Sequence, residues 1–391
     1  MARAWVSRDR FTLALTRRHL LLASGDVVTL TLDDGSVFEV QIEEVEFGGG
    51  RLLCRGVRFR ADVFASAAAG DSGLFPPQVL PAVPETTLRL LNLPPVTPAS
   101  VFAPVFFAAA AGTDTGWRGA ALYQSTDGGA DYGQLAGLAA PAVMGTCQNV
   151  LGDGPDASWD EANTLTVRLL HDDMTLESRP ELAVLNGANA ALVGAEIIQF
   201  KTAVLDQSGD YVLSGLLRGR RGTEHAIASH GVNENFTLLT PATAVAVEVG
   251  FTALGKDYLY KGVSVGNSLV DAPAQNFTYT GLNLKPFSPV HVRGARGSGG
   301  DLAITWVRRT RGAGDWLDGA DVPLAEEVEA YEVDILNSGA VVRTITTSTP
   351  TVTYTAAQQT ADFGAIQSSV DVAVYQLSAT VGRGTPASAT L

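Results

Sequence analysis

Apolar and polar positions alternate with a period of two over most of this chain, and turns rich in glycine separate the alternating segments. Such alternation is typical of half-buried β-strands, whereas an amphipathic helix needs a period near 3.6 residues. Helical periodicity is scarce. The pattern therefore predicts a mainly β protein, built from small β-barrel-like domains followed by a β-sandwich.

The first region, residues 1–84, consists of short alternating segments joined by tight turns. The predicted strands are residues 11–15, 25–32, 36–42, 43–47 and 51–59. Residues 33–35 read Asp-Asp-Gly, a composition that favours a tight hairpin turn. Strands of this length and spacing favour a small barrel over an open sheet. The Ala-rich stretch at 65–70 and the prolines that follow it predict a linker.

The second region, residues 85–285, contains a hairpin and a short helix among further strands. Residues 196–205 and 211–217 alternate and are joined by a polar five-residue turn, so they are predicted to pair. A short helix is expected after Thr223, whose hydroxyl can cap the first turn. It would end at His230, with Gly231 in the left-handed position that follows. The sequence leaves open whether this region is one domain or two.

The third region, residues 286–391, carries seven alternating segments and is predicted to form a β-sandwich. These segments are residues 285–294, 301–309, 328–336, 341–347, 351–354, 369–379 and 387–391. The glycine-rich residues 294–300 join two of these strands and do not open a helix, so they are not expected to hold a phosphate.

The charge balance limits the classes of partner. The formal net charge is −14, which argues against a general nucleic-acid binder because neutralising phosphates needs surplus Lys and Arg. The longest apolar run, residues 101–111, is interrupted by Pro104 and is too short for a membrane-spanning helix. No secretory signal is recognised, so Cys54 and Cys147 are expected to be free, buried thiols in a protein made in the cytoplasm.

One segment concentrates positive charge in this acidic chain. Arg218, Arg220 and Arg221 occupy three of four consecutive positions, and Gly219 and Gly222 accompany them. Guanidinium groups can clamp phosphates, and they can also bind anionic glycans. Since no aromatic residues are interleaved, we expect instead an exposed loop at a domain or subunit junction, where the arginines bond carbonyl and carboxylate oxygens.

Other motifs that could carry chemistry are weaker. Residues 70–73 read Gly-Asp-Ser-Gly, as around a nucleophilic serine, but they lie in the predicted linker and are expected to form a turn. His225 and His230 are five residues apart, which does not place two imidazoles on one helical face for zinc. His230 is instead expected in the last turn of the short helix, where the helix dipole favours it.

Acidic side chains cluster between Asp153 and Glu161, with Asp156 and Asp160 between them. Calcium binding is one interpretation, but Gly and Pro interrupt any EF-hand spacing, so a solvated loop is favoured. The pair Glu326 and Glu327 lacks the partner acid and sugar platform of a glycosidase. We therefore expect no catalytic residues, no metal site and no cofactor, and we do not expect an enzyme.

The run from Leu213 to Ala226, with His230-Gly231 and the strand beginning at Phe236, resembles a recurrent segment of phage tail-tip proteins. That family includes the large host-specificity or "megatron" hub protein of gene transfer agents and related siphophages. The N-terminal run from Thr16 resembles a strand pair of their tail-protein domain. In the third region four residues match positions typical of a fibronectin type III domain: Pro289, Trp306, Tyr331 and Tyr375.

This resemblance implies a structural component of a tail tip or baseplate, located in the virion, that takes part in tail closure and host attachment. It implies a homotrimer whose partners are distal tail, tape-measure and fibre proteins, with a host cell-surface receptor or glycan as a further partner and no specific nucleic-acid binding. The hub proteins are usually longer, and this chain corresponds to their late region. The alternative is a receptor- or carbohydrate-binding protein that acts through its fibronectin-like module, with Trp316 as the candidate for surface binding.

Overall fold

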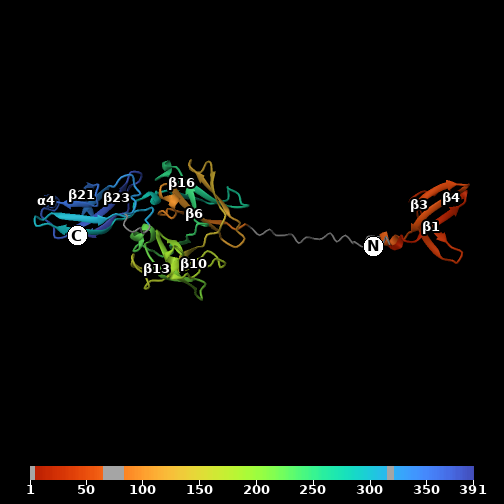
Figure 1. Cartoon of the computed structure of the whole chain (residues 1–391), viewed down its shortest axis with the longest axis horizontal. Coiled ribbons are helices and arrows are strands. Elements are labelled where there is room, and N and C mark those ends of the chain that lie inside the picture. The colour runs from red at the N-terminus through yellow and green to blue at the C-terminus, as the bar shows by residue number, and fades with distance from the viewer. Residues whose placement is uncertain (1–4, 65–82, 315–320) are drawn as a thin grey trace. The chain divides into compact units, whose positions relative to one another are not determined.

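The computed structural model describes residues 5–64, 83–314 and 321–391, and the chain divides into two compact units, residues 1–80 and 81–391 (Figure 1). The mainly β prediction is confirmed, since the named α-helices are short: α2 (Ala61–Phe64), α3 (Glu181–Leu185) and α4 (Ala356–Phe363). Most of the predicted linker and the Gly-Asp-Ser-Gly motif lie outside the described residues. None of the described helices is long and apolar enough to cross a membrane.

The first unit is a four-stranded antiparallel sheet in the order β1-β4-β3-β2. Its strands are β1 (Arg10–Leu15), β2 (Val27–Thr31), β3 (Val37–Gly48) and β4 (Arg51–Arg58), and the 3-10 turn η1 (Arg17–His19) follows β1. Val40, Ile42, Leu52 and Cys54 form its buried core. The small barrel expected here is not formed: over the described residues the sheet is open, with β1 and β2 at its edges. Two predicted segments merge into β3, because a bulge between Ile42 and Glu44 lets one strand continue.

The second unit begins with two sheets that pack on each other. One has the order β15-β6-β5 and the other the order β17-β16-β7-β8. The strands are β5 (Thr86–Leu91), β6 (Val105–Gly112), β7 (Ala120–Ser125), β8 (Gly133–Leu138), β15 (Val245–Glu248), β16 (Asp257–Ser264) and β17 (Ala274–Thr278). Phe106 on β6 packs edge-on against Tyr260 on β16, with ring centroids 5.4 Å apart. The turn η2 (Pro98–Val101) lies between β5 and β6, η5 (Phe251–Ala253) lies between β15 and β16, and η6 (Leu282–Leu284) follows β17.

Between β8 and β15 the chain forms a closed six-stranded barrel in the order β10-β13-β12-β11-β14-β9 (Figure 1). Its strands are β9 (Met144–Cys147), β10 (Leu165–Leu169), β11 (Ala190–Val193), β12 (Glu196–Leu205), β13 (Tyr211–Leu217) and β14 (Asn235–Leu238). The predicted hairpin of residues 196–205 and 211–217 coincides with β12 and β13 and is confirmed. The strands of residues 85–285 therefore fall into two groups, the barrel and the pair of sheets.

Strand β6 joins these two groups because every residue along it is buried. One face, including Phe106 and Ala108, packs inside the pair of sheets, and the other, including Phe107 and Ala109, packs against barrel residues. Arg89 on β5 adds polar contacts: it donates to the carbonyl oxygen of Gly145 at 2.7 Å, and it also donates to that of Phe236. Burial lowers the pKa of Arg89 to about 10. The long apolar run in the sequence is thus a strand buried on both faces.

The last part of the chain is a β-sandwich of two antiparallel sheets. The sheet β18-β19-β22 contains β18 (Val290–Arg296), β19 (Leu302–Val307) and β22 (Thr351–Tyr354), and the other follows the path β21-β20-β23-β24, with β25 also on β23. Its strands are β20 (Tyr331–Asn337), β21 (Ala340–Thr347), β23 (Asp371–Ser378), β24 (Gly382–Arg383) and β25 (Ala387–Thr390). Trp306 and Tyr331 stack edge to face between the sheets, with ring centroids 5.1 Å apart. This arrangement is that of a fibronectin type III-like module, as predicted, while α4 was not predicted.

Both cysteines are free and buried, as expected. Cys54 lies in the core of the first unit, and Cys147 lies in the barrel. Burial raises the pKa of Cys147 to about 12. Its thiol is therefore unreactive as a thiolate near neutral pH.

Candidate functional site

The arginine-bearing segment leaves the barrel at the end of β13 and turns sharply through η3 (Arg220–Gly222) and η4 (Glu224–Ala226). Gly219 and Gly222 have φ angles of 59° and 85°, where a side chain is strained. A β-carbon on Gly222 would also lie 2.5 Å from the ring of Phe287. Arg221 itself has a left-handed φ of 57°. The Arg-Gly alternation therefore encodes a tight turn, a geometry that brings the loop against the barrel end.

Arg218 was expected in an exposed loop, but the structure buries it, with only 1% of its surface exposed. Its guanidinium donates to Glu196 from Nη2 at 2.9 Å and to Asp160 from Nη1 at 3.1 Å. It also donates to the carbonyl oxygens of Gly152, at 2.8 Å, and Ile227, at 3.2 Å. One buried cation thus ties β12 and two loops to the end of β13.

His230 extends this group of charges. Its Nε2 lies 2.6 Å from Glu196 Oε2, its Nδ1 lies 2.6 Å from Glu234 Oε2, and 1% of its side chain is exposed. The helix expected to end at His230 is wrong: only the three-residue turn η4 forms, and Gly231 is not in the left-handed region. Thr223 does not cap it, because its hydroxyl donates to the Arg220 carbonyl and accepts from the Ile197 N–H. The carboxylates, not a helix dipole, hold His230.

Hereafter the buried ionic cluster means Asp160, Glu196, Arg218, His230 and Glu234. Burial acts to raise the pKa of Glu196, but hydrogen bonds from His230, Arg218 and the Gly219 N–H outweigh it and leave the pKa lowered. Asp160 follows the same pattern, with burial outweighed by bonds from Asn163 and Arg218. For His230, burial lowers the pKa, yet the two glutamates raise it above its ordinary 6.5. The cluster therefore favours ionised carboxylates with a protonated imidazole.

We expect the stability that His230 contributes to decline as the pH rises. Because its folded pKa lies above 6.5, the contribution is complete below pH 6.5 and is lost as the pH rises through the folded value. The lowered pKa values of Glu196 and Asp160 act at the other end: their contribution is present above 4.5 and 3.8 and is lost in more acidic solution. Replacing His230→Gln should cost about 2 kcal/mol near pH 6 and less at pH 9, because it removes two charge-assisted hydrogen bonds.

The measurement is urea unfolding of wild type and the His230→Gln variant between pH 5 and pH 9. Hydrogen exchange of the barrel amides is recorded for both proteins over the same pH range. His225 is exposed and provides the control, since His225→Gln should leave the pH dependence unchanged. Parallel pH profiles of wild type and His230→Gln would show that folding leaves the pKa of His230 at its ordinary value, which would contradict this prediction.

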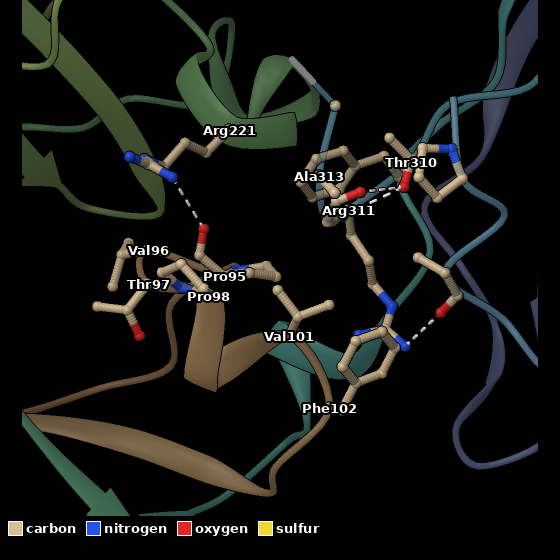
Figure 2. A pocket seen from close by; sticks show the side chains of 15 residues that line it. Pro95, Val96, Thr97, Pro98, Val101, Phe102, Arg221, Thr310, Arg311 and Ala313 are labelled. Carbon is tan, nitrogen blue, oxygen red and sulfur yellow. Dashed lines mark hydrogen bonds between the residues drawn. The ribbon is translucent and has the colours of Figure 1, made fainter. Parts of the chain in front are cut away.

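Arg221 lies at a groove where the arginine-bearing loop meets the fibronectin-like module (Figure 2), and Arg220 lines a second hollow beside it. Arg221 donates from Nη1 to the carbonyl oxygen of Pro95 at 3.1 Å, and Arg220 donates from Nε to the Gln199 amide oxygen at 2.9 Å. Burial and the neighbouring charge of Arg220 both lower the pKa of Arg221. The groove has a volume of about 750 Å³, and Arg221 and Gly314 also line a second hollow of about 490 Å³ beside it.

Two arginines of the fibronectin-like module lie at this junction, and one of them, Arg309, pairs with the arginine-bearing loop. Arg309 pairs with Glu224 of the loop at 2.9 Å, and Arg311 pairs with Glu326 at 2.7 Å. The Arg311 and Glu326 side chains are only 6% and 1% exposed. The expectation of arginines bonding carbonyl and carboxylate oxygens at a junction was made for Arg218, Arg220 and Arg221, and of these Arg221 bonds the Pro95 carbonyl oxygen here.

The acidic loop is not uniformly solvated. Asp153 and Asp156 are exposed, but Asp160 is buried and bound to Arg218, and Glu161 accepts a hydrogen bond from Lys201 at 2.6 Å. Within the described residues, His, Cys, Asp and Glu side chains form no group of three or more that could hold a metal ion. Trp316, the candidate for surface binding, lies outside the described residues.

Several residues at this site were not predicted from the sequence. Glu196 and Glu234 were not singled out, and Arg311 and Glu326 were not recognised as a pair. A usable signal existed for Glu196, because it opens the strongly apolar strand Glu-Ile-Ile-Gln-Phe, where a buried charge demands a partner.

A family model described as "Rcc01698-like, C-terminal" matches residues 142–237. This match spans the barrel from β9 to β14 and includes the whole arginine-bearing loop. No curated protein matches the sequence.

Solved structures with some likeness include domains d3–d4 of the rat CD45 extracellular region, 16% identical over 39% of this chain and 71% of that one, at a TM-score of 0.21. A two-domain fibronectin type III segment of chicken tenascin is 10% identical over 63% and 98%, also at 0.21. Domains A168–A170 of titin are 10% identical over 98% and 93%, at 0.20. These TM-scores are too low to support an inference about the whole chain.

Proposed function

We propose that this protein is a structural component of the tail tip or baseplate of a phage or phage-like particle, in the manner of a hub or host-specificity protein. The observation that supports this most is the family match over residues 142–237. It falls on the barrel and on the same arginine-bearing loop whose sequence resembles the tail-tip hub proteins of gene transfer agents.

The geometry of the loop fits a structural role better than phosphate recognition. Arg218 is fully engaged by two carboxylates and two carbonyl oxygens inside the protein, so it cannot reach a nucleic acid. The carboxylates of Glu196 and Asp160 are held ionised and buried by this same contact, which makes them poor general acids. Both features fit a rigid barrel in a particle that passes DNA without binding it.

In this proposal the barrel and the paired sheets form the body that packs against neighbouring tail proteins. Strand β6, buried on both faces, and Arg89 hold these two groups together as one block. The fibronectin-like module then presents surface to host or fibre. Assembly as a homotrimer, with distal tail, tape-measure and fibre proteins as neighbours, is part of the proposal.

Two measurements test this function. Sedimentation velocity of the purified chain should show a trimer or a monomer–trimer equilibrium, because closure of a tail axis needs several copies. Labelling of purified particles with an antibody to the chain should mark the tail tip. A strictly monomeric chain that is absent from particles and binds a defined glycan would replace this function with the receptor- or carbohydrate-binding alternative.

A further inference from the structure

The groove beside the arginine-bearing loop (Figure 2) adjoins the second hollow, because Arg221 and Gly314 line both. Their volumes of about 750 and 490 Å³ fall in the range of ligand sites in proteins. The elements around them are η2, the arginine-bearing loop, α3 and the start of the segment after β19. Several separate parts of the fold therefore build this surface.

The walls of the groove are largely apolar. Val96, Pro98 and Val101 line one side, Ala313 and Pro323 line another, and Phe102 lies at the edge with 66% of its surface exposed. An exposed phenylalanine beside a concave apolar wall is typical of a surface that accepts an apolar side chain.

Most polar groups of the groove are already bonded inside the protein. The Thr97 hydroxyl bonds with Ser100, and the Thr310 hydroxyl donates to the Gly312 carbonyl oxygen at 2.7 Å. Arg311 donates a hydrogen bond from Nε to Glu326 Oε1 at 2.7 Å. A sugar needs several free hydrogen-bonding groups, so this lining suits a carbohydrate poorly.

The guanidinium groups of Arg220 and Arg221 are the exception, because their internal hydrogen bonds use only some of their N–H groups. Arg220 and Arg221 line the smaller hollow together with the amides of Asn186 and Gln199, and no Asp or Glu is among the described residues that line either space. Arg221 uses Nη1 for the Pro95 carbonyl, and Arg220 uses Nε for Gln199. The remaining terminal nitrogens of both arginines can donate hydrogen bonds to a carboxylate. Guanidinium groups bind carboxylates with two parallel hydrogen bonds.

We propose that this groove binds a short peptide segment of a partner protein in which an apolar residue stands beside an aspartate or glutamate. The apolar side chain lies against Val101 and Phe102, and the carboxylate reaches Arg220 and Arg221. The inference goes beyond the proposed function and does not depend on it, since the groove lies within one chain.

The experiment uses the full chain and a panel of blocked, fluorescein-labelled octapeptides in which Leu, Ile or Phe precedes Asp or Glu. Each peptide has a twin with Asn or Gln in place of the acid. Fluorescence polarisation should show binding at a Kd of about 100 µM or tighter for at least one acidic peptide, which is the strength of a small interface. Its amide twin should bind at least tenfold more weakly.

Two variants test the residues. The double variant R220Q/R221N removes both charges, and Asn tolerates the left-handed φ of Arg221, so the turn is preserved. It should lose at least tenfold in affinity, and Phe102→Ser should lose several-fold. The exposed Arg118 lies away from both spaces, and Arg118→Ala should bind as wild type does. Thermal unfolding of each variant checks the fold.

Three outcomes overturn the proposal. One is that no acidic peptide binds through the arginines, either because none binds at all or because the R220Q/R221N variant binds as well as wild type. Another is that a single-stranded oligothymidylate binds and loses affinity in the same variant, which assigns the arginines to nucleic acid. The third is that peptides bind only after residues 315–320 are replaced by Gly and Ser at equal length, which assigns the groove to the chain itself.

Discussion

Replacing Arg218 with methionine should destabilise the barrel by about 3–5 kcal/mol, one of the two largest effects that we expect from single substitutions in this chain. The substitution keeps most of the side-chain volume, but it removes the guanidinium that pairs with Asp160 and leaves Glu196 with His230 as its cationic partner. The side chains of Glu196 and Asp160 are 0% and 1% exposed, so water cannot take over the role of the guanidinium. The carbonyl oxygens of Gly152 and Ile227 lose their donor as well.

Hydrogen exchange of the β12 and β13 amides measures this loss locally, which matters because a chain of several domains need not unfold in one step. Arg179 provides the matched control. It is also an arginine of the barrel region, but its ion pair with Glu177 is exposed, and Arg179→Met should cost less than about 1 kcal/mol. If Arg218→Met were no more damaging than Arg179→Met, the buried ionic cluster would not be a source of barrel stability.

A triple variant distinguishes the cost of unpaired buried charge from the cost of the lost packing of Arg218. Combining Arg218→Met with Glu196→Gln and Asp160→Asn removes the charges that the single variant leaves uncompensated. It should recover part of the lost stability, since a neutral buried amide costs less than a buried carboxylate. Recovery would show that unpaired charge causes most of the defect, rather than the missing packing of Arg218.

The strands could be predicted from the sequence where local pattern and turn chemistry agree. The hairpin of β12 and β13 is one example, because alternation on both sides of a polar turn fixes both strands and their pairing. Its register pairs Gln199 with Leu217 and Phe200 with Leu216. If this pairing is continued by one residue, Arg218 lies opposite Ile198. Glu196 is then the diagonal neighbour of Arg218 on the same face of the hairpin. The ion pair between Arg218 and Glu196 could therefore have been predicted from the hairpin.

Other features depend on contacts between segments that are distant in sequence. The barrel closes because β9 pairs with both β10 and β14, and no local pattern indicates these partners. The alternation in the first unit is the same as in a barrel strand, yet its sheet is open over the described residues. His230 was assigned to a helix end from its neighbours in sequence, whereas Glu196, 34 positions away, decides its environment. Tertiary charge contacts here override a weak local helix signal.

The second large effect is expected at the fibronectin-like module, where replacing Arg311 with methionine should cost about 3–5 kcal/mol near neutral pH. Arg311 donates from Nε to Glu326 at 2.7 Å and from Nη2 to the Ala325 carbonyl oxygen at 2.9 Å. Its guanidinium also lies 5.4 Å from the centre of the Phe102 ring, across the junction. Without Arg311, Glu326 is a buried carboxylate with no cation.

This defect should depend on pH in a defined direction. Burial raises the pKa of Glu326 above its ordinary 4.5 even with Arg311 present, although Arg311 opposes the shift. An acid whose pKa is raised by folding binds its proton more tightly in the folded state, so stability falls as the pH rises from 4.5 through the folded pKa. Removing Arg311 raises that pKa further. The Arg311→Met variant should therefore approach wild-type stability as the pH is lowered towards 5.

Calorimetry at pH 5 and pH 7.5, with hydrogen exchange of the β20 and β23 amides, checks both the size and the pH dependence of the loss. Asp321→Asn is the control, because Asp321 is 80% exposed and its pairing with Arg308 should contribute less than about 1 kcal/mol at either pH. The double variant Arg311→Met with Glu326→Gln should lose the extra pH dependence and regain part of the stability. A defect of equal size at both pH values would show that Arg311 stabilises the junction by packing on Phe102 and not by compensating Glu326.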